Sequence, residues 1–146
     1  MRALIFVAAL AACSPQTETP ATTAEAPATT TTQSALEQMP TWETARAAGV
    51  DLRAIGQEPG WIVDIYTQGR IVALLDYGQT HLEFPLPEPT APTEDATRFE
   101  TQADGHALSI TYRRLPCQDA MSGESYPATV EVIFDGRTLN GCGRSV

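Results

Sequence analysis

The stretch Trp61-Ile62-Val63-Asp64-Ile65-Tyr66 decides the fold class, because large apolar side chains stand at every second position. Trp61, Val63 and Ile65 form one face of this pattern, and Asp64 and Tyr66 alternate with them. A period of two indicates a half-buried β-strand, since successive side chains of a strand point to opposite faces. The alternation resumes downstream, first at Ile71, Ala73, Leu75 and Tyr77, and then at Leu82, Phe84 and Leu86. We expect tight turns between these strands, at Gln68-Gly69 and Gly78-Gln79.

Two Asp-Gly pairs continue the strand pattern toward the C-terminus. Asp104-Gly105 separates residues 99–103 from 106–115, and Asp135-Gly136 separates residues 128–134 from 137–141. Asp-Gly favours a type I′ hairpin turn, because both central residues of that turn need positive φ. Residues 85–92 hold four prolines, so we expect a loop or an edge crossing there.

The segment before the first strand predicts a short helix over residues 41–48. Thr41 can cap this helix, Glu43 lies in its first turn and Gly49 follows its end. With about seven or eight short strands in about 100 residues, the sequence predicts a mainly β domain over residues 41–146. We expect a small antiparallel barrel or sandwich.

Residues 1–12 predict a lipoprotein signal peptide. After Arg2, residues 3–12 form an apolar run that is too short to span a bilayer, which needs about 20 residues. The run ends in Leu10-Ala11-Ala12-Cys13, which resembles the bacterial lipobox, where signal peptidase II cuts before a cysteine that carries lipid. The alternative is an ordinary signal peptide cut near Ala12, which leaves a free thiol. Ser14 rather than aspartate follows the cysteine, which implies an outer-membrane anchor and a periplasmic domain.

Residues 13–40 predict a lipidated N-terminus and a tether. Residues 14–32 are nearly all Thr, Ala, Pro, Glu and Ser, with no aromatic and no large aliphatic side chain. Such a segment buries too little apolar surface to offset its chain entropy, so we expect a disordered linker. It would keep the β domain clear of the membrane.

The charge balance argues against one class of partner. Nine basic residues stand against 18 acidic ones, which gives a formal net charge of -9. Affinity for nucleic acid depends on clustered cations that face the phosphates, so we expect no nucleic-acid binding. We also expect no cofactor. The expected partners are the membrane, through Cys13, and an envelope protein or peptidoglycan ligand.

The cysteines agree with an oxidising compartment. If Cys13 carries lipid, Cys117 and Cys142 remain, and an even pair in an exported domain most simply forms one disulfide. The functional alternative is a redox pair or a metal site. It has less support, because the sequence has no Cys-x-x-Cys, and neither His81 nor His106 lies at zinc-ligand spacing from a cysteine.

Three segments are more specific than a generic β domain requires. A shaped turn is expected over residues 53–61, and an irregular passage between strands over residues 117–127. With residues 139–142 they contain the motifs Gly56-Gln57-Glu58-Pro59-Gly60-Trp61, Cys117-Gln118-Asp119-Ala120-Met121-Ser122-Gly123-Glu124-Ser125-Tyr126-Pro127 and Leu139-Asn140-Gly141-Cys142.

In this order the motifs resemble those of a family of small proteobacterial envelope proteins, often lipoproteins, of uncharacterised function. The resemblance covers residues 45–143 and implies a compact β domain. Some relatives are joined to a domain that resembles inhibitors of c-type lysozyme. That domain is absent from this sequence, so the resemblance implies no inhibition.

Five residues of the first two motifs are candidates for one binding patch: Glu58, Trp61, Asp119, Ser122 and Tyr126. Loops of a small barrel gather at its ends, so two constrained loops are expected to share one end. Trp61 would supply an apolar floor and Tyr126 a wall, while the two carboxylates would accept hydrogen bonds. The competing interpretation is that both loops are rigid caps that seal the barrel.

Two functions from different classes follow. The favoured one is a non-enzymatic envelope lipoprotein whose β domain binds a protein, a peptidoglycan fragment or another envelope ligand. The alternative is a periplasmic hydrolase acting on cell-wall material, with Ser122, Asp119 and a histidine, or with Glu58 and Asp119 as paired carboxylates. No G-x-S-x-G elbow surrounds Ser122, so we assign no catalytic residue.

Overall fold

The computed structural model describes residues 40–146. The signal peptide, Cys13 and the tether up to residue 39 lie outside the described residues. The described part contains one helix, α2 (Trp42–Ala47), and eleven strands: β1 (Val50–Gln57), β2 (Gly60–Tyr66), β3 (Arg70–Leu75), β4 (Thr80–Pro85), β5 (Thr90–Thr93), β6 (Ala96–Ala103), β7 (His106–Arg113), β8 (Cys117–Gln118), β9 (Ser125–Tyr126), β10 (Ala128–Phe134) and β11 (Arg137–Ser145).

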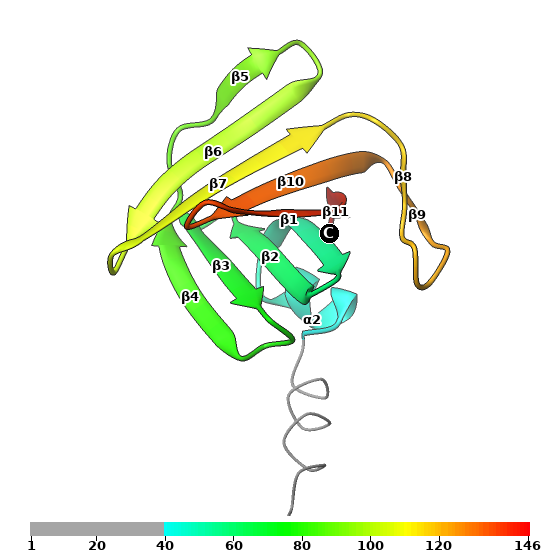
Figure 1. Ribbon diagram of the computed structural model, residues 1–146, viewed down its shortest axis with the longest axis horizontal. Coiled ribbons are helices and arrows are strands. Elements are labelled where there is room, and N and C mark those ends of the chain that lie inside the picture. Colours follow the sequence, from blue (N-terminus) through cyan, green and yellow to red (C-terminus); the bar gives the residue numbers. More distant parts are fainter. Residues whose placement is uncertain (1–39) are drawn as a thin grey trace, which may run out of the picture.

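Nine of these strands form a single antiparallel sheet in the order β4-β3-β2-β1-β11-β10-β7-β6-β5, while β8 and β9 pair separately. The sheet curls into a half-barrel (Figure 1). One side-chain bond links β6 to β4, because Thr101 Oγ1 donates to the carbonyl oxygen of Pro85 at 2.8 Å. The mainly β class is therefore confirmed. The expected barrel or sandwich of seven or eight strands is instead a curled sheet of nine.

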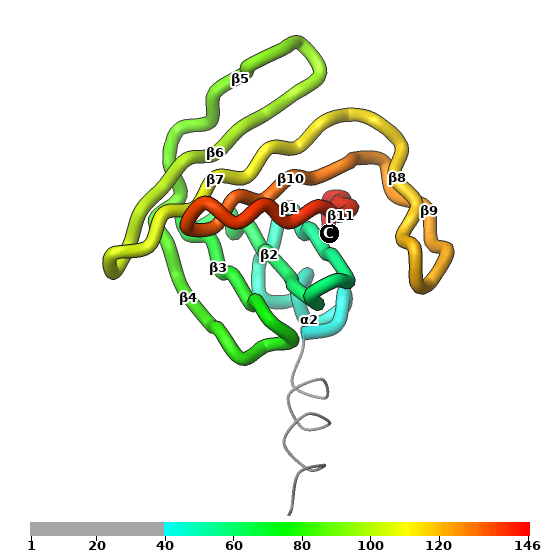
Figure 2. Tube along the Cα trace, viewed as in Figure 1, coloured from blue at the N-terminus to red at the C-terminus, as the bar shows by residue number. Residues whose placement is uncertain are grey.

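The sheet consists of two halves, each built from strands that are close together in the sequence. β1 to β4 form one run of hairpins, and β5, β6, β7, β10 and β11 form the other. The halves meet in the middle of the sheet, where β1 pairs with β11 from Leu52↔Ser145 to Ile55↔Cys142. Figure 2 shows these two strands side by side near the centre of the molecule.

The main core lies on the concave face of the sheet, toward which alternate side chains point. Trp61 is 1% exposed and belongs to this core. Its indole packs on the backbones of Gly56 and Gly141, where an added Cβ would overlap the ring. The two glycines are thus required by close approach, which explains their place in the motifs.

A second, smaller core covers the convex face of β1 and β2, under α2. Ala45 of the helix packs there with Val50 and Tyr66. β2 is consequently buried along its whole length rather than on one face only. No helix within residues 40–146 is long and apolar enough to cross a membrane.

The expected local signals take the conformations that their chemistry favours. Thr41 caps α2 by accepting the backbone N–H of Thr44 at 3.2 Å. Asp104-Gly105 and Asp135-Gly136 have positive φ at all four residues, as type I′ turns need. The proline-rich stretch forms a loop that ends in the edge strand β5.

Two local expectations were wrong. Tyr77 was expected to continue the alternation of Ile71, Ala73 and Leu75, but β3 ends at Leu75 and Tyr77 lies in the following turn with a φ of 58°. Residues 53–57 are not part of a shaped turn but belong to β1, and only Glu58-Pro59 connects β1 to β2. The core-facing residues of this part of β1 are Ala54 and Gly56. Their small size hides the apolar alternation by which a strand is normally found in a sequence.

Candidate functional site

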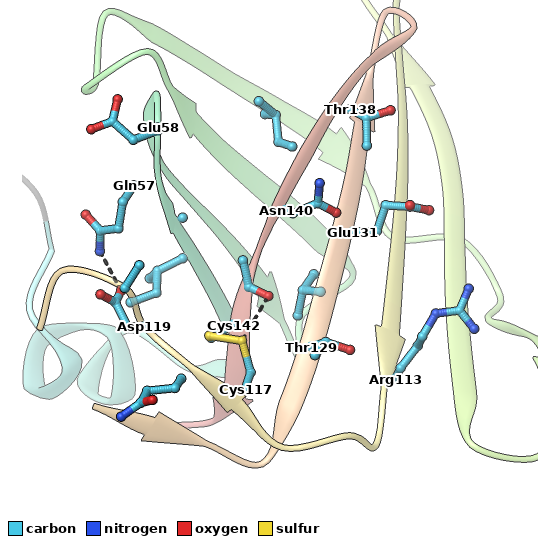
Figure 3. Close-up of a pocket in the computed structure, with 17 residues that line it drawn as sticks. Gln57, Glu58, Arg113, Cys117, Asp119, Thr129, Glu131, Thr138, Asn140 and Cys142 are labelled. Atoms are coloured by element: carbon cyan, nitrogen blue, oxygen red, sulfur yellow. Dashed lines mark hydrogen bonds between the residues drawn. A yellow bond between two sulfur atoms is a disulfide. The ribbon is translucent and has the colours of Figure 1, made fainter. Parts of the chain in front are cut away.

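Residues 117–126, here called the disulfide arm, connect β7 to β10 and contact β11. Cys117 forms a disulfide with Cys142 of β11, with a Cα–Cα distance of 5.5 Å. The predicted disulfide is thus confirmed. It fixes the base of the arm to the convex face of the sheet, since Cys142 follows the core-facing Gly141 on β11 and successive residues of a strand point to opposite faces. Figure 3 shows the disulfide between the arm and β11.

Asp119 shapes the arm from within. Its Oδ1 accepts the backbone N–H groups of Met121 at 2.8 Å and Ser122 at 2.9 Å. The backbone N–H of Gly123 donates to the Asp119 carbonyl oxygen at 2.9 Å. The bond from the Ser122 N–H is the largest cause that holds the pKa of the Asp119 carboxyl below its usual range, because it favours the charged form. Asp119 is therefore a charged, structurally engaged acceptor.

Gln57 joins the arm to the end of β1. Its Nε2 donates to Asp119 Oδ2 at 2.6 Å, across 62 residues of sequence (Figure 3). The structure thus brings the Glu58-Pro59 turn and the arm to the same place. This contact, here called the Gln57 bridge, lies where two grooves adjoin, and residues 55–58 line both of them.

The polar groove lies on the arm side of the bridge and has a volume of about 580 Å³. It runs over the convex face of β1, β11 and β10 (Figure 3). Its polar and charged lining side chains are Gln57, Glu58, Arg113, Gln118, Asp119, Thr129, Glu131, Thr138 and Asn140. No aromatic side chain lines it within the described residues, so it offers hydrogen bonds rather than stacking.

The apolar groove lies on the other side of the bridge, between α2 and the β1–β2 turn, and has a volume of about 620 Å³. Its large apolar lining side chains are Trp42, Ile55, Ile62, Tyr77 and Met121. Trp61 also lines this groove, although its side chain is 1% exposed and belongs to the core.

The five predicted patch residues occupy different surroundings. Glu58 and Ser122 are exposed, at the β1–β2 turn and in the arm. Trp61 and Asp119 are buried, and each lines a different groove. Tyr126 is buried and lines neither groove.

Tyr126 instead helps to hold the arm against the helix. Its ring lies 6.1 Å from that of Trp42, and its hydroxyl donates to Glu124 Oε2 at 3.0 Å. Arg144 donates to the other oxygen of Glu124 at 2.7 Å and lies over the Trp42 ring. Burial, helped by Glu124, raises the pKa of Tyr126 to about 12, so its phenol stays protonated.

The groups considered for a hydrolase do not form one set: among the described residues no hydrogen bond joins a histidine to Asp119 or Ser122, and none joins Glu58 to Asp119. His106 Nδ1 lies 2.6 Å from Asp135 Oδ2, and Asp119 bonds to Gln57 and to its own arm. Ser122 Oγ accepts the Glu124 N–H at 3.2 Å. The described residues contain no cluster of three or more His, Cys, Asp or Glu side chains that could hold a metal ion.

Sequence reasoning missed most of the polar groove. Glu131, Thr138 and Asn140 occupy alternate positions on β10 and β11, which resembles the ordinary solvated face of a strand. Register was the missing information: Asn140 lies opposite Glu131, and Glu131 lies opposite Thr111 of β7. The signals that the sequence did offer were Glu58 and Asp119, both expected in a binding patch, and the amides of Gln57 and Asn140 within the first and third motifs.

The three motifs meet around the same strands. Gly56 and Gly141 lie beneath Trp61, while Cys117 and Cys142 close the arm onto β11. The residue types at these four positions are therefore explained by the packing of Trp61 and by the disulfide, independently of any ligand. Comparisons with protein-family models, with curated proteins and with solved structures found no significant match to this chain.

Proposed function

We propose that this chain is a lipid-anchored protein of a bacterial envelope whose β domain binds an envelope ligand without converting it chemically. The polar groove is the proposed ligand site. The observation that supports it most is a concave surface of about 580 Å³ whose walls carry amide, hydroxyl and charged side chains. The anchor and the outer-membrane location rest on the Leu10-Ala11-Ala12-Cys13 sequence and on Ser14.

The side chains of this groove favour a ligand rich in amides and hydroxyls. Asn140 of β11 and Glu131 of β10 lie opposite each other in the groove, on strands about 4.8 Å apart. Arg113 borders the groove on β7, where its guanidinium can meet a carboxylate. The peptide part of a peptidoglycan fragment carries amides and carboxylates, whereas its hydroxyl groups belong to the sugars. Because no aromatic platform is present, we propose that this peptide, rather than the sugar, supplies most contacts.

A titration distinguishes contacts with the peptide from contacts with the sugar. The full chain carrying Cys13→Ser would be mixed with soluble disaccharide-peptide fragments of peptidoglycan, and with the disaccharide alone, and followed by NMR. We expect the amide signals of Asn140 and Glu131 to shift with the peptide-bearing fragment only. Asn140→Ala removes one hydrogen-bonding group and should weaken binding about 2- to 10-fold.

Gln102→Ala is the matched control. It also removes an exposed amide, but from β6, which lies beyond β7 in the sheet and outside the groove. It should leave the affinity unchanged. Equal weakening by both variants, or no shift at Asn140, would contradict the proposed site. Release of cleaved fragments during the titration would instead support the hydrolase.

A further inference from the structure

The apolar groove gathers exposed apolar surface beside the polar one. Tyr77 is 38% exposed and Met121 is 71% exposed, and both line this groove. Ile55, Ile62 and Trp42 complete its apolar wall. Exposed apolar surface that is concave and contiguous is characteristic of a binding site, whereas single exposed apolar residues are not.

The polar groups inside this groove already have partners. The Arg53 Nε and Nη2 donate to the two carboxylate oxygens of Asp64 at 2.7 Å each, and Nη1 donates to the Pro40 carbonyl oxygen at 2.6 Å. The Tyr77 hydroxyl donates to the Gln57 carbonyl oxygen at 3.3 Å. An occupant therefore gains little from a polar group in the interior of the groove, and an apolar side chain fits it best.

The rim of the apolar groove carries one negative charge. Among the described residues that line the groove, only Arg53 and Glu58 are charged, and Arg53 is neutralised by Asp64. Glu58 is exposed at the β1–β2 turn and has no ion-pair partner within residues 40–146. One uncompensated carboxylate therefore stands at the edge of an apolar cavity.

We propose that the apolar groove binds a peptide segment in which a large aliphatic residue is followed by a lysine or arginine. The aliphatic side chain enters between Ile62 and Met121, and the cation lies beside Glu58. Charge complementarity selects this occupant over a neutral apolar peptide, because the interior supplies no polarity and the rim supplies one negative charge. The site lies across the Gln57 bridge from the polar groove, with which it shares residues 55–58 along one edge, and it does not depend on the function proposed above.

Two acetylated and amidated tetrapeptides provide the first test: Gly-Leu-Lys-Gly and Gly-Leu-Glu-Gly. They would be titrated into the full chain carrying Cys13→Ser, with its disulfide formed, and amide shifts followed by NMR. We expect the lysine peptide to shift the signals of Ile62, Tyr77 and Met121, which line only the apolar groove, and to bind at least about threefold more tightly than the glutamate peptide. Added salt should reduce this difference, because the charges at the rim are exposed.

Two pairs of variants assign the contacts. Glu58→Lys should weaken the lysine peptide about 3- to 10-fold, while Glu88→Lys makes the same charge change at an exposed loop residue away from the groove and should not. Met121→Gln should weaken both peptides, while Leu115→Gln changes another exposed apolar residue, 48% exposed, and should weaken neither.

The proposal would be overturned by shifts confined to the polar groove, by no shift at millimolar peptide, or by equal affinity for the two peptides. Asn140→Ala separates this site from the proposed function. Loss of peptide binding in that variant would also overturn the proposal, whereas unchanged peptide binding supports a separate site whether or not peptidoglycan fragments bind.

Discussion

Replacing Asp64 by asparagine tests the role of the buried ion pair under α2. Both carboxylate oxygens of Asp64 accept hydrogen bonds from Arg53 at 2.7 Å, and both side chains are 2% exposed. The asparagine side chain would keep the volume but would leave a buried guanidinium without a counter-charge. Removing one partner of a buried pair typically costs about 3–5 kcal/mol. A domain of this size is stable by about 5–15 kcal/mol, so the loss is a large fraction of the total.

Urea unfolding, followed by the fluorescence of Trp42 and Trp61, measures this loss. With an m-value of about 1.5 kcal/mol/M, a cost of about 3 kcal/mol lowers the midpoint by about 2 M. Glu83→Gln is the control, because it removes the charge from an exposed ion pair in which Arg70 Nη1 lies 3.3 Å from Glu83 Oε2. That change should cost less than about 1 kcal/mol.

A double variant distinguishes the charge from the packing. Arg53→Met with Asp64→Leu removes both charges and keeps apolar volume, so its unfolding free energy should return to that of the wild type or exceed it. The reasoning fails if Asp64→Asn costs less than about 1 kcal/mol. It also fails if the double variant is no more stable than Asp64→Asn.

Three further predictions concern the arm and the anchor. Reducing the Cys117–Cys142 disulfide should lower the unfolding free energy by about 3 kcal/mol, measured as urea midpoints with and without reductant. The pKa of Asp119 is lower in the folded chain than its unfolded-state value of about 3.9. Its contribution to the unfolding free energy is therefore fully present above about pH 3.9 and is lost as the pH falls through the lower folded-state pKa. Hydrogen exchange of the Ser122 amide should therefore become faster, relative to global unfolding, in that acidic range, and Asp119→Asn should remove this pH dependence. Labelled palmitate should enter the wild-type chain and not Cys13→Ser, and equal labelling would refute the lipid anchor.

Local chemistry explains how much of the fold the sequence predicted. The positive φ of Asp135 and Gly136 follows from the residues themselves, and so does the cap at Thr41. The strand at residues 53–57 escaped prediction because Gly56 lies under the indole of Trp61, a contact between neighbouring strands. Such a contact leaves no periodic signal in the strand that supplies the small residue.

The grooves were less predictable than the strands, for the same physical reason. The role of Asp119 in its own arm could be expected, because aspartate side chains commonly accept nearby backbone N–H groups. Its bond to Gln57 could not be expected from spacing, since it depends on where the curled sheet places β1. Trp61 could be interpreted from the sequence as a core or rim aromatic or as the floor of a ligand site, and its 1% exposure places it in the core.

The pairing of β1 with β11 also determines when the molecule can complete its folding. Every other neighbouring pair in the sheet joins strands that follow one another in sequence, apart from the arm between β7 and β10. The central pair alone joins strands from opposite ends of the described domain, so the two halves cannot close on each other until β11 has been synthesised. Contacts of such long sequence separation slow folding, which gives a newly made chain a period without its central seam. During that period the edge of β1 that later pairs with β11 has no partner strand, and an unpaired strand edge can pair with other chains.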